Sequence, residues 1–139
     1  PLFYAFREAL NLILEEGLDK RIKRHRICAD AFYSGLSSMG LTPFAKPNAR
    51  SNVVISLNYL PGMDDKKFRS LLSDDFKILV AGGFGELKGK VFRIGSMGEV
   101  SKYHVMRTLA SISSAMNILG FNVNPEATSI AQKKVKDLE

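Results

Sequence analysis

The sequence is poor in the residues that build disulfides, metal clusters and membrane spans. Cys28 is the only cysteine among 139 residues, which excludes an internal disulfide and a zinc cluster held by several thiolates. The two histidines, His25 and His104, do not have the spacing of metal ligands. No apolar run approaches the roughly 20 residues that cross a bilayer. These shortages favour a reducing, cytoplasmic setting, and no metal site is predicted.

Positive charge is in excess, with a net charge of +6 at pH 7 and a pI of about 9.6. Much of it lies in the run "DKRIKRHR", residues 19–26, within a predicted helix. Charges on a helix commonly form a solvated face, whereas a phosphate-binding helix would make the chain a basic nucleic-acid-binding module. The run lacks the interleaved aromatic residues on which nucleic-acid bases stack. Nucleic-acid binding through residues 20–26 is therefore kept as the alternative function.

The hydrophobic spacing predicts one domain, residues 1–139, with helices and strands in mixed order. Helices are expected over 3–16 and 18–36, then after caps at Asp64 and Ser101, and finally with Asn124 as cap and Pro125 at the first helical position. Strands are expected over 52–60, 76–83 and 90–95. This order predicts an α+β fold, in which helices pack on one face of a small, mostly antiparallel three-stranded sheet.

The glycine-rich connection "GGFGELKGK", residues 82–90, does not match a phosphate-binding loop. The pattern G-x-x-x-x-G-K-[ST] requires a glycine five residues before Gly89 and a Ser or Thr after Lys90, but Phe84 and Val91 stand there. No predicted helix follows these glycines, so a dinucleotide-binding fingerprint is excluded as well. We expect a flexible hairpin connection in which glycines allow unusual backbone angles.

The predicted strand "KVFRIG" carries a charge, Arg93, among residues typical of a dry environment. Side chains alternate along a strand, so Phe92 and Ile94 point to one face while Val91, Arg93 and Gly95 point to the other. If Phe92 and Ile94 meet the helices, Arg93 projects from the uncovered face. A guanidinium there suits a planar carboxylate or a phosphate, bound through two parallel hydrogen bonds. An ordinary ion pair with an internal acid explains the residue equally well at this point.

Two stretches resemble a known family. "AGGFGELKGKVFRIGSMG", followed by a long predicted helix, resembles the C-terminal part of class V pyridoxal-phosphate aminotransferases, most closely the serine–pyruvate and alanine–glyoxylate aminotransferase group. "FYAFREALNLILEEGLDKRIKRHR" is similar to the helix that follows the large domain in that family. The likeness runs in order along nearly the whole chain, and "GG-x-G" followed by "GK-x-FRIG-x-MG" is its most specific part.

The resemblance implies a fold-type-I enzyme. In that family a large domain carries pyridoxal 5'-phosphate on a lysine, and a small C-terminal domain closes over it where the domains meet at a dimer interface. The arginine of "RIG" binds the substrate α-carboxylate in the family, which implies this role for Arg93. Gly82 and Gly83 match family glycines, which implies that the hairpin approaches the substrate. The implied reaction moves an amino group from a small amino acid, such as alanine or serine, to a 2-oxo acid such as glyoxylate or pyruvate.

The chain lacks the cofactor-binding lysine that the family pattern contains. No lysine lies in the family's cofactor motif, and Lys46, Lys77, Lys88 and Lys90 are expected in loops or at strand ends. Residues 1–139 are therefore expected to be the small domain alone, without the large domain, inactive by itself and binding no cofactor. Cys28 is predicted to lie in a helix, which disfavours relatives that use a cysteine nucleophile in a loop. The amino donor and the acceptor stay open.

Overall fold

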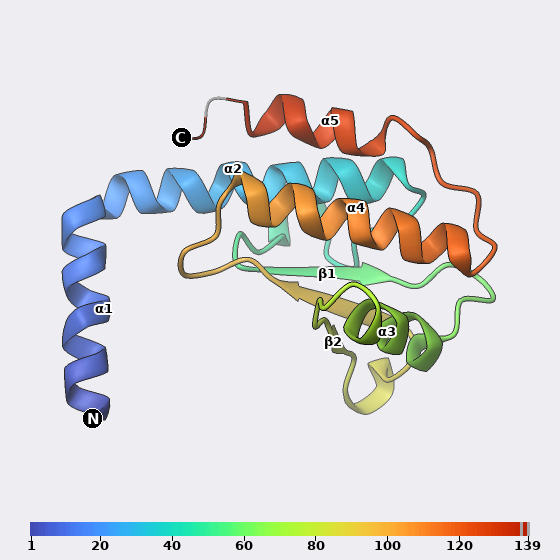
Figure 1. Cartoon of the computed structure of the whole chain (residues 1–139), viewed down its shortest axis with the longest axis horizontal. Coiled ribbons are helices and arrows are strands. Elements are labelled where there is room, and N and C mark those ends of the chain that lie inside the picture. Colours follow the sequence, from blue (N-terminus) through green and yellow to red (C-terminus); the bar gives the residue numbers. More distant parts are fainter. Residues whose placement is uncertain (137, 139) are drawn as a thin grey trace.

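The computed structural model of the chain describes residues 1–136 and 138, in which helices cover one side of a small sheet (Figure 1). In chain order the elements are α1 (Leu2–Glu16), α2 (Leu18–Ser38), β1 (Val54–Asn58), α3 (Asp65–Asp74), β2 (Ala81–Gly82), β3 (Val91–Gly95), α4 (Lys102–Ile118) and α5 (Ala127–Lys134). Figure 1 shows α2, α4 and α5 side by side above the sheet, and α1 projecting from the beginning of α2.

The sheet is antiparallel throughout, with the strand order β1-β3-β2. β3 lies in the middle, and its Arg93 is opposite Ser56 of β1 and Ala81 of β2. Along β1, Ile55 and Leu57 are fully buried whereas the residues between them are half-buried. This alternation confirms the predicted α+β fold, with the helices packed on one face of the sheet.

An aromatic cluster marks where the sheet meets the helices. Phe92 of β3 and Phe68 of α3 are fully buried, and their ring centres lie 5.2 Å apart. The ring of Tyr59 lies 5.2 Å from that of Phe92 and 5.9 Å from that of Phe68. Phe92 therefore points to the helices, as predicted. Because successive residues of a strand alternate, Arg93 points to the other face.

The second strand is much shorter than the prediction over 76–83. Only Ala81 and Gly82 pair with β3, while the Ile78 N–H donates to the Leu72 carbonyl at the end of α3. Leu79 is 86% exposed, and residues 76–80 form a connection instead of a strand. An apolar run of this length is typical of a strand, but the sequence alone does not show whether a neighbouring strand is there to pair with it.

Of the predicted helix caps at Asp64 and Ser101, only the first makes a capping hydrogen bond. Asp64 caps α3 as predicted, since its carboxylate accepts a hydrogen bond of 2.7 Å from the Lys67 N–H. Ser101 stands at the N-cap of α4, but its Oγ lies 2.9 Å from His104 Nδ1 and caps no backbone N–H. The hydroxyl group has a nearby side chain as an alternative partner, which the position of the residue does not reveal.

The last helix begins later than predicted. α5 starts at Ala127, whereas Pro125 was the expected first position. Asn124 does act at this end, because its Oδ1 accepts a hydrogen bond of 2.9 Å from the Glu126 N–H. That bond closes a turn before the helix instead of capping its first turn.

α1 is an amphipathic helix, as predicted, but it has no core to pack on. None of its residues is buried. Its exposed apolar side chains are Leu2, Phe3, Tyr4, Phe6, Leu10, Leu12 and Leu14. Among the described helices, α1 included, none combines the length and the apolar character that a membrane span requires. An apolar face of this extent is typical of a surface that another part of a protein covers.

The different burial of Phe68 and Phe3 predicts that their replacement by alanine lowers the stability of the chain by different amounts. Phe68→Ala is expected to lower the free energy of unfolding by about 3–5 kcal/mol, because it leaves a cavity in the core. Phe3→Ala removes the same ring from a side chain that is 89% exposed, so a change below about 0.5 kcal/mol is expected. Urea unfolding followed by circular dichroism measures both values. Equal losses in the two variants would contradict this description of the core.

Candidate functional site

Arg93 lies in the middle strand, on the face of the sheet that the helices leave uncovered. Its cross-strand neighbours are Ser56 and Ala81, which are small. Arg93 and Ser56 are half-buried and Ala81 is exposed, so a ligand can reach the guanidinium from outside. The sheet face is thus accessible at Arg93 itself, although Val91 on the same face of β3 is buried.

The guanidinium is held by a backbone carbonyl and an aromatic ring. Its Nε and Nη2 both donate to the Gly82 carbonyl oxygen, at 3.1 and 2.8 Å. Its Cζ lies 5.1 Å from the centre of the Phe84 ring, within the range of a cation–π contact. These contacts fix one edge of the guanidinium. They leave Nη1 and the second hydrogen of Nη2 for another partner.

No acid neutralises Arg93 within residues 1–136 and 138. The ion pairs found there involve other residues, namely Arg21 with Glu16 and Glu99, Arg24 with Glu16, and Arg69 with Asp65. Pairing with an internal acid, which the sequence left open, is therefore not what the described structure shows. A guanidinium whose Nη1–Nη2 edge faces an accessible surface suits a carboxylate or a phosphate.

Gly82 and Gly83 shape the surroundings of Arg93 in different ways. Gly82 provides the carbonyl that holds the guanidinium, and a Cβ added to it would lie 3.2 Å from the Arg69 Nε, toward α3. A Cβ added to Gly83 would lie 2.1 Å from the Leu87 carbonyl oxygen, which is closer than any side chain tolerates. Gly83 thus allows the glycine-rich connection to fold back onto β3. Contact of either glycine with a substrate stays a prediction.

The described residues do not fit a cofactor that is held on a lysine. Lys46, Lys77, Lys88 and Lys90 lie in loops or beside strand ends, as predicted, and all are exposed, whereas a Schiff-base lysine needs a desolvated pocket. Cys28 is fully buried, and burial raises the pKa of its thiol, so it packs in the core and is not an activated nucleophile. Pyridoxal phosphate therefore does not fit this chain by itself.

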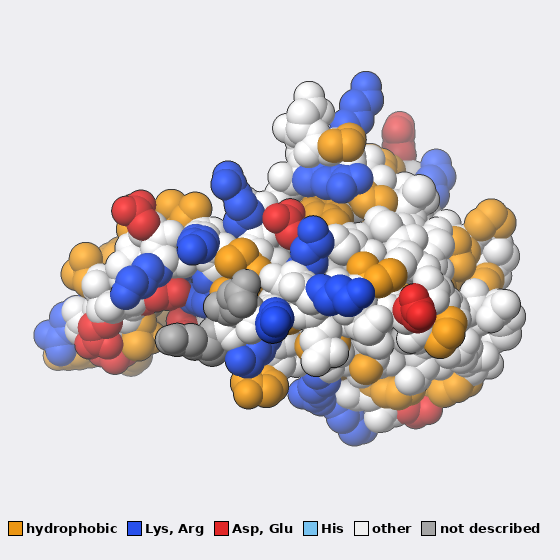
Figure 2. All heavy atoms as spheres, turned by 90° about the horizontal axis from the view of Figure 1, so that it is seen from above, with side chains coloured by type: hydrophobic (Ala, Val, Ile, Leu, Met, Phe, Trp, Pro, Cys, Tyr) orange, Lys and Arg blue, Asp and Glu red, His pale blue; other side chains and the backbone are white. Residues whose placement is uncertain are grey.

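The basic run of α2 does not make a continuous charged surface. Lys20, Lys23 and Arg26 are exposed, whereas Arg21 and Arg24 are half-buried and paired with Glu16. Figure 2 shows that, on the side covered by α5, lysine and arginine side chains are scattered and separated by neutral, acidic and apolar surface. Neither observation supports the nucleic-acid-binding alternative.

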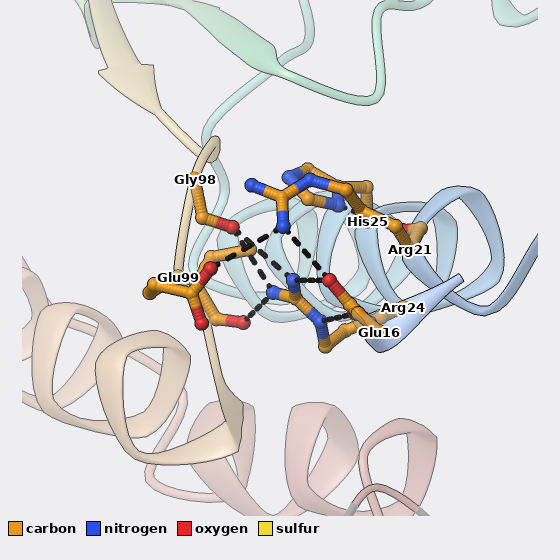
Figure 3. A network of polar contacts seen from close by, with 7 residues as sticks. Glu16, Arg21, Arg24, His25, Gly98 and Glu99 are labelled. Carbon is orange, nitrogen blue, oxygen red and sulfur yellow. Dashed lines mark hydrogen bonds and ion pairs between the residues drawn. The ribbon is translucent and has the colours of Figure 1, made fainter. Parts of the chain in front are cut away.

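A second polar group, which we call the Glu16 cluster, joins α1 to α2 and to the loop after β3 (Figure 3). It consists of Glu16, Arg21, Arg24 and the carbonyls of Gly98 and Val100. Glu16 accepts hydrogen bonds from Arg24 Nε at 2.6 Å, Arg24 Nη2 at 2.8 Å and Arg21 Nη1 at 2.8 Å. Arg24 also donates to the carbonyls of Gly98, at 3.2 Å, and of Val100. The hydrogen bond from Arg24 is the main cause that lowers the pKa of Glu16 to about 2.

The sequence did not predict the Glu16 cluster, because its members belong to three elements and match no motif. The run "DKRIKRHR" was interpreted as a solvated face, and two of its arginines are instead half-buried. The spacing of the charged residues around Gly17 did contain a signal for the ion pairs of Glu16. Glu16 directly precedes Gly17, a residue suited to a bend, and Arg21 and Arg24 follow within the next helix.

Several curated relatives of the chain are named as aminotransferases, although no family model matches the chain. The chain is 46% identical over 132 residues to an uncharacterised aminotransferase of Methanocaldococcus jannaschii, covering 95% of this chain and 34% of that protein. It is 36% identical over 132 residues to the (S)-ureidoglycine–glyoxylate transaminase of Bacillus subtilis, covering 94% of this chain and 31% of that protein. The chain thus spans about a third of the length of the curated relatives it matches.

Solved structures give the same result. The crystal structure of ureidoglycine–glyoxylate aminotransferase from Bacillus subtilis matches with a TM-score of 0.92 and 33% identity, over 96% of this chain and 35% of that one. Pyridoxamine–pyruvate aminotransferase from Mesorhizobium loti matches with a TM-score of 0.87 and 27% identity, over 91% and 33%. The fold described above is therefore that of one part of these longer enzymes.

The two glycines beside Arg93 predict different responses to a methyl group. Gly83→Ala is expected to lower the free energy of unfolding by about 1–3 kcal/mol, because the backbone at Leu87 has to move. Gly82→Ala is the matched control, with a change expected below about 1 kcal/mol, since the nearest atom belongs to the flexible side chain of Arg69. Urea unfolding compares them. A larger loss for Gly82→Ala would show that the close approach is misplaced.

The Glu16 cluster predicts a loss of stability in acid. The pKa of Glu16 is about 2 in the folded chain, below its ordinary value of 4.5, so the unfolded chain binds the proton more tightly. Its contribution is fully present above pH 4.5 and is lost as the pH falls toward 2. Glu16→Gln should therefore destabilise the chain by about 1 kcal/mol or more at neutral pH and by much less at about pH 3.

Urea unfolding of the wild type and Glu16→Gln at the two pH values tests this expectation. Glu15→Gln is the control, because Glu15 is exposed and lies on the same helix. A difference between wild type and Glu16→Gln that stays constant with pH would contradict the assignment of the lowered pKa.

Proposed function

The chain belongs to the class V pyridoxal-phosphate aminotransferases, and on that premise we propose that it is the C-terminal domain of an enzyme that moves an amino group from a small amino acid to a 2-oxo acid. The support is its identity to aminotransferases along nearly its whole length, of which it spans about a third. Alone, the domain is expected to be inactive. The large domain of the same polypeptide would be its main partner.

The main structural support for the proposal is the Nη1–Nη2 edge of the Arg93 guanidinium. Nε and Nη2 are held by the Gly82 carbonyl, and no acid pairs with the guanidinium in the described residues, so its Nη1–Nη2 edge can receive a carboxylate. Amino acid and 2-oxo acid substrates share an α-carboxylate, so one arginine serves both halves of the reaction. A carboxylate held by two parallel hydrogen bonds lies in the plane of the guanidinium. That restricts the orientation of the substrate Cα and makes the role of Arg93 geometric.

The cofactor would be bound by the rest of the enzyme. Pyridoxal 5'-phosphate, when bound there, supplies the electron sink that removal of the Cα proton requires. Gly82 and Gly83 contribute from this domain by holding Arg93 and the connection beside it. We propose alanine, serine or a similar amino acid as donor and glyoxylate or pyruvate as acceptor. The names of relatives with glyoxylate or pyruvate as substrate support the acceptor class.

We also propose that the complete enzyme is a cytoplasmic homodimer, in which this domain closes over the cofactor at the dimer interface. The resemblance to the family supports the dimer. The single cysteine, kept as a buried thiol, supports a reducing compartment.

Arg93→Ala in the complete enzyme is expected to raise KM for both the amino acid and the 2-oxo acid, with kcat/KM falling by more than about 100-fold. Two hydrogen bonds to a charged group are lost, each worth roughly 1.5–3 kcal/mol. Arg93→Lys should recover little of the activity, because a lysine lacks the two-nitrogen fork. Steady-state kinetics with both substrates measure these constants.

Arg26→Ala is the matched control, since Arg26 is exposed on α2 within the basic run. It removes an arginine of the same charge without touching the site, and its kinetic constants should stay within about twofold of wild type. Wild-type constants for Arg93→Ala would refute the assigned role of this residue.

A further inference from the structure

The direction of α1 depends on very few contacts. Among the side-chain hydrogen bonds of residues 1–136 and 138, those that connect α1 to the rest of the molecule all end on Glu16. No residue of α1 is buried. Figure 1 accordingly shows α1 standing away from the body of the domain. The Glu16 cluster is therefore the main restraint on the angle between α1 and α2.

The backbone between these helices bends at Gly17, whose N–H donates to the Ile13 carbonyl at 2.9 Å and whose carbonyl accepts from the Arg21 N–H at 3.0 Å. Gly17 has φ 84° and ψ 133°, a conformation that other residues rarely adopt. A Cβ added to Gly17 would have no atom within 4 Å, so no side chain packs against the junction on that side. Without the Glu16 cluster, the two helices could bend against each other at Gly17.

Arg24 extends the restraint to the strand that carries Arg93. Its Nη1 and Nη2 donate to the Gly98 carbonyl and its Nη1 also to that of Val100, in the loop that leads from β3 to α4 (Figure 3). Arg93 lies five residues before Gly98. Arg21 makes a second link, because its Nη1 binds Glu16 at 2.8 Å and Glu99 of the same loop at 3.3 Å. Glu16 of α1 is thus connected to the Arg93 strand through two arginines and one short loop.

The pair at the centre of the cluster is built for a fixed geometry. Arg24 and Glu16 side chains are 17% and 22% exposed, and both carboxylate oxygens receive a hydrogen bond from the guanidinium. A two-point contact of this kind restricts direction as well as distance. An exposed pair with a single contact would be screened and mobile.

We propose that the Glu16 cluster positions Arg93 in the complete enzyme. This inference rests on the proposed function. α1 docks by its apolar face on the remaining part of the same enzyme, which makes up about two thirds of the length of the relatives. The Glu16–Arg24 pair then fixes the angle at which the sheet, and with it Arg93, faces the substrate. Glu16 and Arg24 are positioning residues that touch no substrate.

The test uses the complete enzyme with Glu16→Gln, Arg24→Lys and the double variant. Gln keeps the size of Glu16, and Lys keeps the charge of Arg24 but lacks the planar fork that contacts both carboxylate oxygens. We expect KM for both substrates to rise about tenfold while kcat stays within about threefold, because a misplaced Arg93 weakens carboxylate binding. The double variant should be no worse than the worse single variant, since both break one contact.

Two further measurements separate positioning from general damage. Propionate, a simple carboxylate, serves as a competitive inhibitor, and its inhibition constant should rise by the same factor as KM.

Spin labels at positions 8 and 110, on α1 and α4, report the angle between α1 and the body of the domain. Their distance distribution should be narrow in the wild type and broad or shifted in both single variants. Glu15→Gln should leave every value unchanged.

Unchanged KM and inhibition constants in Glu16→Gln and Arg24→Lys would overturn the inference, whether or not the distance distribution changes. A rise in KM with an unchanged distance distribution would also overturn it, because the angle would not be the cause. A different result, wild-type kinetics of Arg93→Ala, would refute the proposed function itself. If Arg93→Ala is impaired and the two cluster variants are not, the positioning inference alone is wrong.

Discussion

A half-buried guanidinium without an acidic partner is the constraint around which this domain is arranged. Burying part of a charge costs free energy unless hydrogen bonds compensate for it. The Gly82 carbonyl satisfies one edge of Arg93, and the Phe84 ring lies against its face. The other edge needs water or an anion. The fully buried ring of Phe92 enforces this arrangement from the opposite side, because Arg93 cannot turn inward while Phe92 fills the core.

Two parts of the domain lack an interaction partner, and a single further polypeptide segment could provide both partners. Arg93 lacks a counter-charge among the described residues, and the apolar face of α1 lacks a cover. A polypeptide that binds a substrate with its carboxylate toward Arg93, and that covers the apolar face of α1, would supply both partners. Relatives about three times as long as this chain are consistent with such a polypeptide. The Glu16 cluster lies between the two features, which is why its geometry matters for both.

The sequence predicted the parts of the fold that local chemistry decides. Alternation along "KVFRIG" predicted the faces of Phe92 and Arg93, and the Asp64 cap was visible in the residue type. Other parts depend on distant partners. The run over 76–83 pairs with β3 at only two residues, and its Ile78 N–H donates instead to the Leu72 carbonyl at the end of α3. Ser101 turns to the nearby side chain of His104 instead of the backbone. Arg24 donates both to Glu16 and to the Gly98 carbonyl, which joins three elements. The spacing of Glu16 and Arg24 hinted at the first contact, but nothing in it indicated the contact with Gly98.

A crystal structure of the complete enzyme with a bound substrate carboxylate tests the role of Arg93 most directly. Both carboxylate oxygens are expected about 2.7–3.0 Å from the Nη1 and Nη2 atoms of Arg93, with the Gly82 carbonyl still holding the other edge. A carboxylate bound to a different residue, with Arg93 facing only solvent or paired with an acid of the missing domain, would contradict it.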